Sequence, residues 1–496
     1  MTLLRLFKNT KPSEAGTFHE ENEADFGEER WFKAILLLLG LGLGVLLAFF
    51  IVSGNWPVVF GLLLLIPAVI LFSSYPYAAL IIWMLVNIFL QTTPNSAYRM
   101  AFWIMHRGMP PVALVMVVLA SLFKTTERRP VRLGRADLAM LAFLGLAMVN
   151  ILLFHPSPLQ YLYWLYDRVV VPMCLYLLIR LVAPGEQDLK RLIPVAFFIV
   201  LVEFTVGLLS WLSPGVLPQD WLGTAAERTI GTLGAAHAYS TTLVAFSLLL
   251  FQAAMQHKSG PIRTALLFTV GLGAIGVFLS FSRGGWLGGI VAALGLLVMY
   301  PKPIIRLTMI LLIIMSILGA SVFSKEIAFA QERMNSESTA KDRLVIWDAG
   351  LQMVALKPFF GWGYADYSLY AGQFQRRVYN YVATASHASH NSYIAIAVEM
   401  GVPALIIFAL PLLWWLSLTF KVWPRLPKVG FGSRSLLVIF WLVILDHIVV
   451  NFFSDMRHSP YGMGMWWITL GLIANMVNTH LTFDDSKLPQ WIRRAA

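Results

Sequence analysis

The sequence predicts an all-α membrane protein with many helices crossing the bilayer and one large loop outside it. Of the 496 residues, 58% are hydrophobic and only 13% are charged. The mean hydropathy is +0.71. Apolar runs of about 18 residues recur from Ala34 onward, and a run of that length crosses a hydrocarbon core of about 30 Å. Because lipid cannot satisfy backbone polar groups, such runs form helices.

Fourteen apolar runs are predicted to be membrane spans, so we expect a bundle of about 12–14 transmembrane helices. The fourth run is the shortest and the weakest candidate. The predicted spans are residues 34–54, 56–73, 75–93, 110–123, 136–154, 169–183, 192–212, 237–256, 264–281, 284–300, 307–323, 391–419, 435–455 and 461–480.

The N-terminal segment 1–33 is mostly polar and includes an acidic cluster between Glu20 and Glu29. No short apolar core with a small-residue cleavage site precedes the first span, so we expect that span to remain as a signal anchor. Cys174 is the only cysteine and lies in an apolar run. An intrachain disulfide is therefore excluded.

The distribution of positive charge predicts the orientation in the membrane. With the N-terminus inside, the loops on the inner side hold fifteen Lys and Arg residues, and the short outer loops hold six. Cytoplasmic loops carry such an excess, so both termini are expected to be cytoplasmic. The net charge of +11 is then a consequence of topology, and a nucleic-acid partner is not expected. The six outer residues are Arg99, Arg107, Arg168, Arg228, Arg283 and Arg457.

This topology divides the chain into five parts. Residues 1–33 form a cytoplasmic segment, 34–323 a transmembrane bundle, and 324–390 a large periplasmic or extracytoplasmic loop. Residues 391–480 form the C-terminal transmembrane helices, and 481–496 a cytoplasmic tail.

The outer loop is too long to be a simple connection in a compact bundle. It contains seven basic, six acidic and eleven aromatic residues. Its residues Leu344, Trp347, Leu351 and Val354 recur at helical spacing, and Pro358 is expected to end that helix. The apolar face of this helix is best explained by packing on the bundle or in the headgroups.

Aromatic side chains beside the Gly361–Tyr364 turn offer a second interpretation of this loop. Trp362 and Tyr364 provide aromatic faces near charged groups, a combination that suits a sugar, so both are predicted to bind substrate. Aromatic residues also mark the membrane interface, which is the alternative.

Arg283 lies between two long apolar runs, where a charge must face water, a partner or a ligand. The predicted topology puts Arg228, Arg343 and the segment from His387 to Asn391 on the same outer side. We interpret this group as an anion site, because a guanidinium matches phosphate oxygens with a planar fork.

His390 opens a predicted helix at the outer boundary of the membrane, where an imidazole can accept a proton near neutral pH. It is therefore predicted to be a general base, and the alternative is a histidine that simply lies at the interface. His387 and His390 have a spacing that metals accept, but a third ligand such as His237 would have to come from another helix. No metal or cofactor is expected.

Four further ionisable residues lie within predicted spans. Asp446 and His447 are at mid-membrane depth, too deep for chemistry at the outer face, and are interpreted as a buried polar pair that holds helices together. Glu203 is interpreted in the same way. Glu399 lies nine residues after His390, about 13 Å further along a helix, and is expected to be too deep to act on the same atom.

Four ordered motifs resemble the C-terminal signature of the O-antigen ligase and O-antigen polymerase superfamily. They lie within a resemblance that spans about residues 230–410. The motifs are Ser282-Arg283-Gly284-Gly285-Trp286, then Arg343 with Trp347 and Gly350, then Pro358 with Gly361-Trp362-Gly363, then His390-Asn391-Ser392-Tyr393 with Glu399-Met400-Gly401.

The resemblance implies an integral glycosyltransferase that moves a glycan from undecaprenyl diphosphate to an acceptor hydroxyl, without a metal, outside the bacterial inner membrane. Arg228 and Arg283 would hold the diphosphate and His390 would act on the acceptor. His387, Arg343, Asn391, Trp362 and Tyr364 are the expected substrate-binding residues. Expected partners are the lipid-linked donor, a glycan or lipid A-core acceptor, membrane lipids and other polysaccharide assembly proteins.

Two departures from the ligase pattern favour a repeat-unit polymerase for O antigen or exopolysaccharide over a ligase. Ala404 stands where ligases have a second glycine, and fourteen predicted spans exceed the twelve usual in ligases. A lipid-linked glycan transporter is the alternative from another class, but the chain shows no internal repeat and no inverted pair of broken helices. A structural or partner-binding membrane protein would need neither Arg283 nor His390.

Overall fold

The computed structural model describes residues 52, 67, 70–72, 74–91, 101–122, 134–222, 228–321, 328, 331, 338–375 and 388–481. The chain divides into two compact units, Met1–Ala68 and Val69–Ala496. All elements below belong to the second unit. The predicted span 34–54 lies outside the described residues except for Val52, as do the segments 1–33 and 482–496.

Within the described ranges every regular element is helical and no strand occurs, which confirms the predicted fold class. The helices are α3 (Tyr77–Asn87), α5 (Met109–Leu122), α6 (Arg135–Phe154), α7 (Pro158–Leu165), α8 (Val171–Val182), α9 (Glu186–Lys190), α10 (Leu192–Leu212), α11 (Ala236–Met255), α12 (Pro261–Leu279), α13 (Arg283–Met299), α14 (Pro301–Ser321), α16 (Ser338–Leu356), α17 (Tyr367–Phe374), α18 (Ser392–Met400), α19 (Val402–Val422), α20 (Arg434–Phe453) and α21 (Pro460–Thr479).

Seven helices in the described part of the chain are long and apolar enough to cross a membrane, which confirms a polytopic membrane protein. Two shorter apolar helices accompany them. The seven are Trp103–Ala120, Arg135–Phe154, Glu186–Leu212, Ala236–Met255, Pro261–Leu279, Val402–Arg425 and Arg434–Phe453, and the shorter two are Tyr77–Leu90 and Arg283–Met299.

The predicted single span 391–419 is wrong, because the structure divides it at Gly401 into α18 and α19. Gly401 has φ +87°, and a Cβ atom there would lie 2.2 Å from the carbonyl oxygen of Phe359. The Gly361–Tyr364 turn, between α16 and α17, also binds the end of α18. The Trp362 amide donates to Val398 O at 2.9 Å, and the Gly363 amide donates to Glu399 O at 3.0 Å. The break therefore follows from a close backbone approach that glycine allows.

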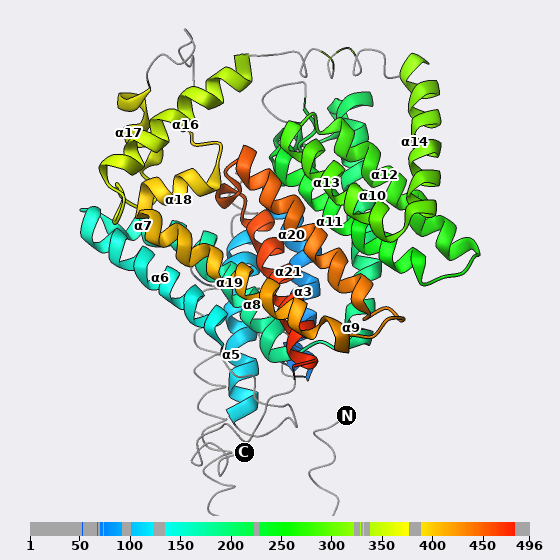
Figure 1. Ribbon diagram of the computed structural model, residues 1–496, viewed down its shortest axis with the longest axis horizontal. Coiled ribbons are helices and arrows are strands. Elements are labelled where there is room, and N and C mark those ends of the chain that lie inside the picture. The colour runs from blue at the N-terminus through cyan, green and yellow to red at the C-terminus, as the bar shows by residue number, and fades with distance from the viewer. Residues whose placement is uncertain are drawn as a thin grey trace, which may run out of the picture. The chain divides into compact units, whose positions relative to one another are not determined.

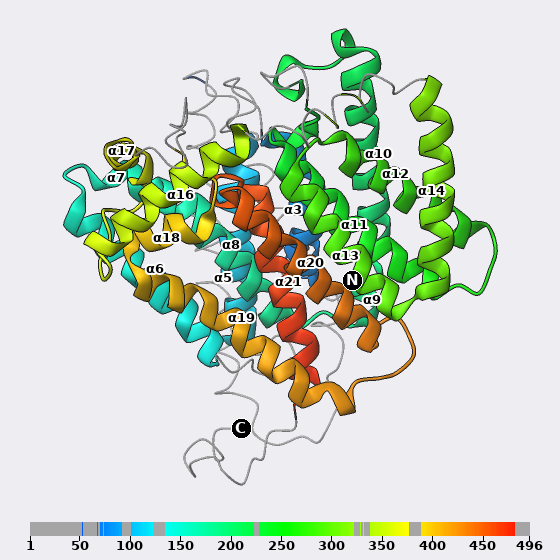
Figure 2. The same ribbon diagram turned by 45° about the horizontal axis from the view of Figure 1, so that its top comes forward.

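α16, α17 and α18 lie together beside α7, and α20 and α21 lie between this group and helices α10–α13 (Figures 1 and 2). α16 ends at Leu356, ahead of Pro358 as predicted. Its buried face differs in part from the predicted stripe. Trp347 and Val354 pack against the core as predicted, but Ile346 and Met353 form that core, and Leu344 and Leu351 are 41% and 59% exposed. The reason is that α17 and α18 cover a neighbouring face of the helix.

Candidate functional site

One cavity of about 690 Å³ opens where several helix connections meet. This volume is within the range of ligand pockets. Its residues come from the α10–α11 and α12–α13 connections, the first part of α16, the start of α17, the segment before α18 and the α20–α21 connection. The lining residues with polar side chains are Arg228, His237, Ser282, Arg283, Asp342, Arg343, Tyr367, Ser368, Ser389, His390, Glu399, Ser454, Asp455 and His458.

The structure brings the three predicted anion-binding arginines to this cavity from three different elements. Arg228 follows α10, Arg283 is the first residue of α13, and Arg343 lies on α16. Ser282 caps α13 by accepting a hydrogen bond from the Gly285 amide at 3.2 Å. The positive end of the α13 dipole therefore lies beside Arg283 and adds to the attraction for an anion.

Three backbone positions on the cavity wall have unusual conformations. Phe281, Ala365 and His390 have φ values of +47°, +65° and +46°. Only one other non-glycine residue in the described chain, Ala183, has a positive φ, and it ends α8. A positive φ at a non-glycine residue costs free energy and persists only where the surrounding structure compensates. Such residues concentrate at functional sites.

His390 is held by hydrogen bonds made by the residues on both sides of it. The Ser389 hydroxyl donates to Asp455 Oδ2 at 3.2 Å. Asn391 Oδ1 accepts from the amides of Tyr393 and Ile394, both at 2.9 Å, and so caps α18. Asn391 is 1% exposed and does not line the cavity. The structure thus places Asn391 as a helix cap beside His390.

The environment of His390 favours its neutral form. Burial lowers the pKa of His390, and the nearby Arg343 and Arg228 lower it further, whereas Asp455 and Asp342 act in the opposite direction. A neutral imidazole can accept a proton, which is the state that a general base needs. The arginines that line the cavity therefore keep His390 in the neutral form that can accept a proton, although the same positive charges make it a weaker base.

A buried ionic network that was not predicted from the sequence supports the segment around His390. Arg457 Nη1 donates to Glu399 Oε2 at 2.6 Å, and Arg457 Nη2 donates to Asp455 Oδ2 at 2.6 Å. Burial alone would raise the pKa of Asp455, but Arg457 holds that pKa well below its usual range. The available signal was Asp455-Met456-Arg457-His458, an acid–base cluster in a short outer loop.

From the sequence, Glu399 is predicted to be too deep to act on the same atom as His390. Glu399 lines the same cavity, because α18 ends one residue later and does not continue into the membrane as part of one long helix. Its carboxylate is 3% exposed and pairs with Arg457.

Trp362 and Tyr364 lie outside the cavity. The Trp362 indole donates to the carbonyl of Met353 at 2.9 Å and stacks under Lys357. Tyr364 is 4% exposed, and its amide donates to Asn150 Oδ1 at 2.8 Å. Both join the outer helices to their neighbours, so the predicted aromatic sugar surface is not part of the cavity wall. His387 lies outside the described residues.

His237 lines the cavity together with His390. Among the described residues, no group of three or more His, Cys, Asp and Glu side chains is arranged to hold a metal ion. Asp446 and His447 are buried in α20 and are not among the cavity residues.

Residues 268–409, less than a third of the chain, match the family model of O-antigen ligase. No curated protein matches the sequence. The matched region contains thirteen of the residues that line the cavity, among them Arg283, Arg343, His390 and Glu399. The matched region and the helical membrane fold support the resemblance of this chain to the O-antigen ligase and O-antigen polymerase superfamily.

Proposed function

We propose that this protein is an inverting glycosyltransferase that moves a glycan from undecaprenyl diphosphate to a sugar hydroxyl. The observation that supports it best is the meeting of Arg228, Arg283 and Arg343 with His390 at one cavity. The proposed location is the outer face of the bacterial inner membrane, with both termini in the cytoplasm.

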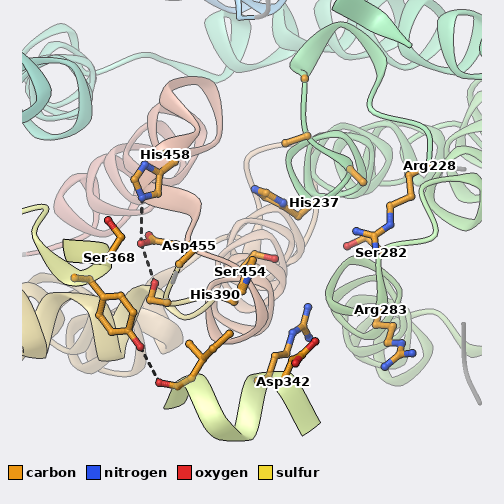
Figure 3. A pocket seen from close by; sticks show the side chains of 18 of the residues that line it. Arg228, His237, Ser282, Arg283, Asp342, Ser368, His390, Ser454, Asp455 and His458 are labelled. Atoms are coloured by element: carbon orange, nitrogen blue, oxygen red, sulfur yellow. Dashed lines mark hydrogen bonds and ion pairs between the residues drawn. The ribbon is translucent and has the colours of Figure 1, made fainter. Parts of the chain in front are cut away.

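The donor diphosphate is assigned to the side of the cavity formed by Arg228, Ser282 and Arg283 (Figure 3). Guanidinium groups stay protonated and bind phosphate oxygens in a bidentate manner. In a site protected from water, each donor aimed at the developing charge contributes about 3–4 kcal/mol to transition-state stabilisation. These arginines supply the positive charge that a metal ion would otherwise supply to the diphosphate, so the proposed reaction uses no metal.

The acceptor is assigned to the opposite side, where Ser368, Asp455 and His458 lie, with His390 between the two sides (Figure 3). Hydroxyl, imidazole and carboxylate groups exchange hydrogen bonds with sugar hydroxyls. Asp455 and Glu399 share the single guanidinium of Arg457. His458 Nε2 lies 3.5 Å from Asp455 Oδ2, and with a neutral His458 imidazole this side retains negative charge and favours an acceptor without phosphate.

In the proposed reaction, His390 accepts the proton of the acceptor hydroxyl while its oxygen attacks the anomeric carbon of the donor. The bond from that carbon to the phosphate oxygen breaks, and undecaprenyl diphosphate leaves with the negative charge. Direct displacement inverts the configuration at the anomeric carbon. A positioned base contributes about 10²–10⁴ to the rate, and the arginines stabilise the leaving group.

The first proposal for the product is a polymer of repeat units, as in O antigen or exopolysaccharide. The cavity side near Asp455 supports it, since a repeat unit without phosphate suits that wall. Ligation of O antigen to the lipid A-core is the second proposal, and the matched O-antigen ligase model favours it. A lipid-linked glycan transporter would need a polar path across the bundle, whereas Arg228, Arg283, Arg343 and His390 gather at one cavity, apart from the buried Asp446 and His447.

Surface polysaccharide from a deletion strain tests the two products. A gel profile with a single repeat on each core indicates a missing polymerase. Accumulated lipid-linked polymer beside a bare core indicates a missing ligase. Purified protein incubated with lipid-linked repeat units and an acceptor tests the transfer itself, and transport without a new glycosidic bond would contradict the proposal.

A further inference from the structure

Glu203 lies in the membrane-spanning part of α10 and is fully buried. From the sequence, Glu203 is predicted to be a buried polar contact that holds helices together. Its carboxyl instead binds the connection that carries Arg228. The Thr232 amide donates to Glu203 Oε2 at 3.2 Å, and the Thr232 hydroxyl contacts Glu203 Oε1.

Gly231 packs directly on this carboxyl group. It has φ +57°, and a Cβ atom there would lie 2.0 Å from Glu203 Oε2 and 2.5 Å from the ring of Tyr239. The Tyr239 hydroxyl donates to the backbone carbonyl of Glu203 at 3.2 Å. The connection is therefore fixed against α10 by both shape and hydrogen bonds.

α10 holds the residue next to Arg228 as well. The Trp211 indole donates to Thr229 Oγ1 at 2.8 Å. A Cβ atom on Gly207 would lie 3.0 Å from the methyl group of Thr229, so this glycine provides the space for that side chain. Glu203, Gly207 and Trp211 thus form one face of α10, which we name the α10 clamp.

The α10 clamp also reaches the segment that carries Arg283. The ring of Trp211 contacts Phe281 edge-on, with centroids 5.5 Å apart. The Thr229 amide donates to the carbonyl of Leu279 at 3.4 Å. The positions of the two arginine segments are consequently coupled through Trp211 and Thr229.

We propose that Glu203 is a positioning residue that, through a neutral carboxyl group and Thr232, fixes Arg228 for binding of a lipid-linked diphosphate. This inference rests on the proposed function. The hydrogen-bond count supports the neutral form: the Thr232 hydroxyl also lies 3.1 Å from the carbonyl oxygen of Ile88, and a hydroxyl has one proton to donate. Both contacts are satisfied when the carboxyl group donates to the hydroxyl. A neutral group also avoids the cost of an unpaired charge in the membrane.

The test uses the purified full chain in nanodiscs and measures the affinity for undecaprenyl diphosphate. Thr232→Val is expected to raise Kd about tenfold, which equals about 1.4 kcal/mol. Thr269→Val is the matched control, because Thr269 is also buried and its hydroxyl bonds only within α12, to Ala265. We expect it to change Kd by less than about twofold.

Changes at Glu203 distinguish positioning from general stability. Glu203→Gln preserves the hydrogen bonds of a neutral carboxyl group and should keep Kd within about twofold, whereas Glu203→Leu should raise it about tenfold. In turnover assays the loss should appear in the donor KM, with kcat largely retained. Trp211→Phe keeps an aromatic ring beside Phe281 but removes the indole hydrogen bond to Thr229 Oγ1. It provides a second test if Thr232→Val folds poorly.

Equal affinities for Thr232→Val and Thr269→Val would overturn the inference, and so would binding by Glu203→Gln that is as weak as binding by Glu203→Leu. If the wild-type protein transfers no glycan but the variants bind undecaprenyl diphosphate in the expected order, the proposed function fails and the positioning role stands. If transfer occurs and the α10 clamp variants bind normally, the positioning role fails alone.

Discussion

Arg457 binds Glu399 through two hydrogen bonds, Nη1 to Oε2 at 2.6 Å and Nη2 to Oε1 at 3.2 Å, and both side chains are almost buried. Arg457 lies in the α20–α21 connection and Glu399 near the end of α18. The pair joins the C-terminal helices to the short helix that begins beside His390. The position of the proposed base, His390, therefore depends on a residue 67 positions further along the chain.

Arg457→Ala is expected to lower stability and turnover together. The substitution leaves Glu399 and Asp455 buried without their shared partner, and breaking a buried ion pair in this way costs about 3–5 kcal/mol. Thermal unfolding in detergent and transfer activity are the measurements. Arg306→Ala, at an exposed position of α14, is the control and should change neither. A stable, active Arg457→Ala protein would contradict the supporting role of the network.

The rate of transfer is expected to fall at acid pH as His390 becomes protonated. Burial and the nearby arginines lower the pKa of His390. The acid limb of the pH–rate profile should therefore lie below the ordinary histidine value of about 6.5. Arg343→Gln removes a positive charge, which favours the protonated form, so it should move this limb to higher pH. Arg306→Gln serves as the charge-matched control, and an unchanged limb in Arg343→Gln would argue against His390 as the base.

Arg283→Ala should abolish transfer while the protein remains in the membrane. Arg283→Lys should restore little activity, because an ammonium group lacks the planar fork that binds phosphate oxygens. Transfer rates normalised to the amount of protein in the membrane are the measurement. Full activity in the Lys variant would remove the diphosphate role from Arg283.

His458→Ala is expected to raise the acceptor KM and leave the affinity for undecaprenyl diphosphate unchanged. The reason is that His458 lies on the acceptor side of the cavity, opposite Arg228 and Arg283 (Figure 3). Arg228→Ala should show the reverse pattern. Initial rates at varied acceptor and donor concentrations separate the two effects, and a raised donor KM in His458→Ala would reverse the assignment of the two sides.

The orientation in the membrane can be tested with single cysteines in a Cys174→Ser background. Leu369 is 63% exposed on α17 and Val429 is 84% exposed in the α19–α20 connection, so both positions are accessible to a reagent. An impermeant thiol reagent added from outside should label Leu369→Cys and not Val429→Cys. Labelling in the opposite order would place the cavity in the cytoplasm and would exclude an outer-face transferase.

The sequence by itself determined the helical membrane fold. Long apolar runs can satisfy their backbone only as helices in lipid, so local composition is sufficient to predict them. Sequence also singled out Arg283, because a charge between two apolar runs is costly and rare. The predicted topology and the family motifs added Arg228, Arg343 and His390. The structure brings these four together at one cavity.

Only the tertiary structure decided how the site is held. The end of α18 at Gly401 has a local signal, because Pro403 follows the glycine, but the backbone of Phe359, which packs against Gly401, lies more than forty residues earlier. The ion pair between Arg457 and Glu399 and the contact of Glu203 with Thr232 likewise join segments that are distant in sequence. The free energy of such contacts depends on packing and burial, and these arise only when the helices assemble.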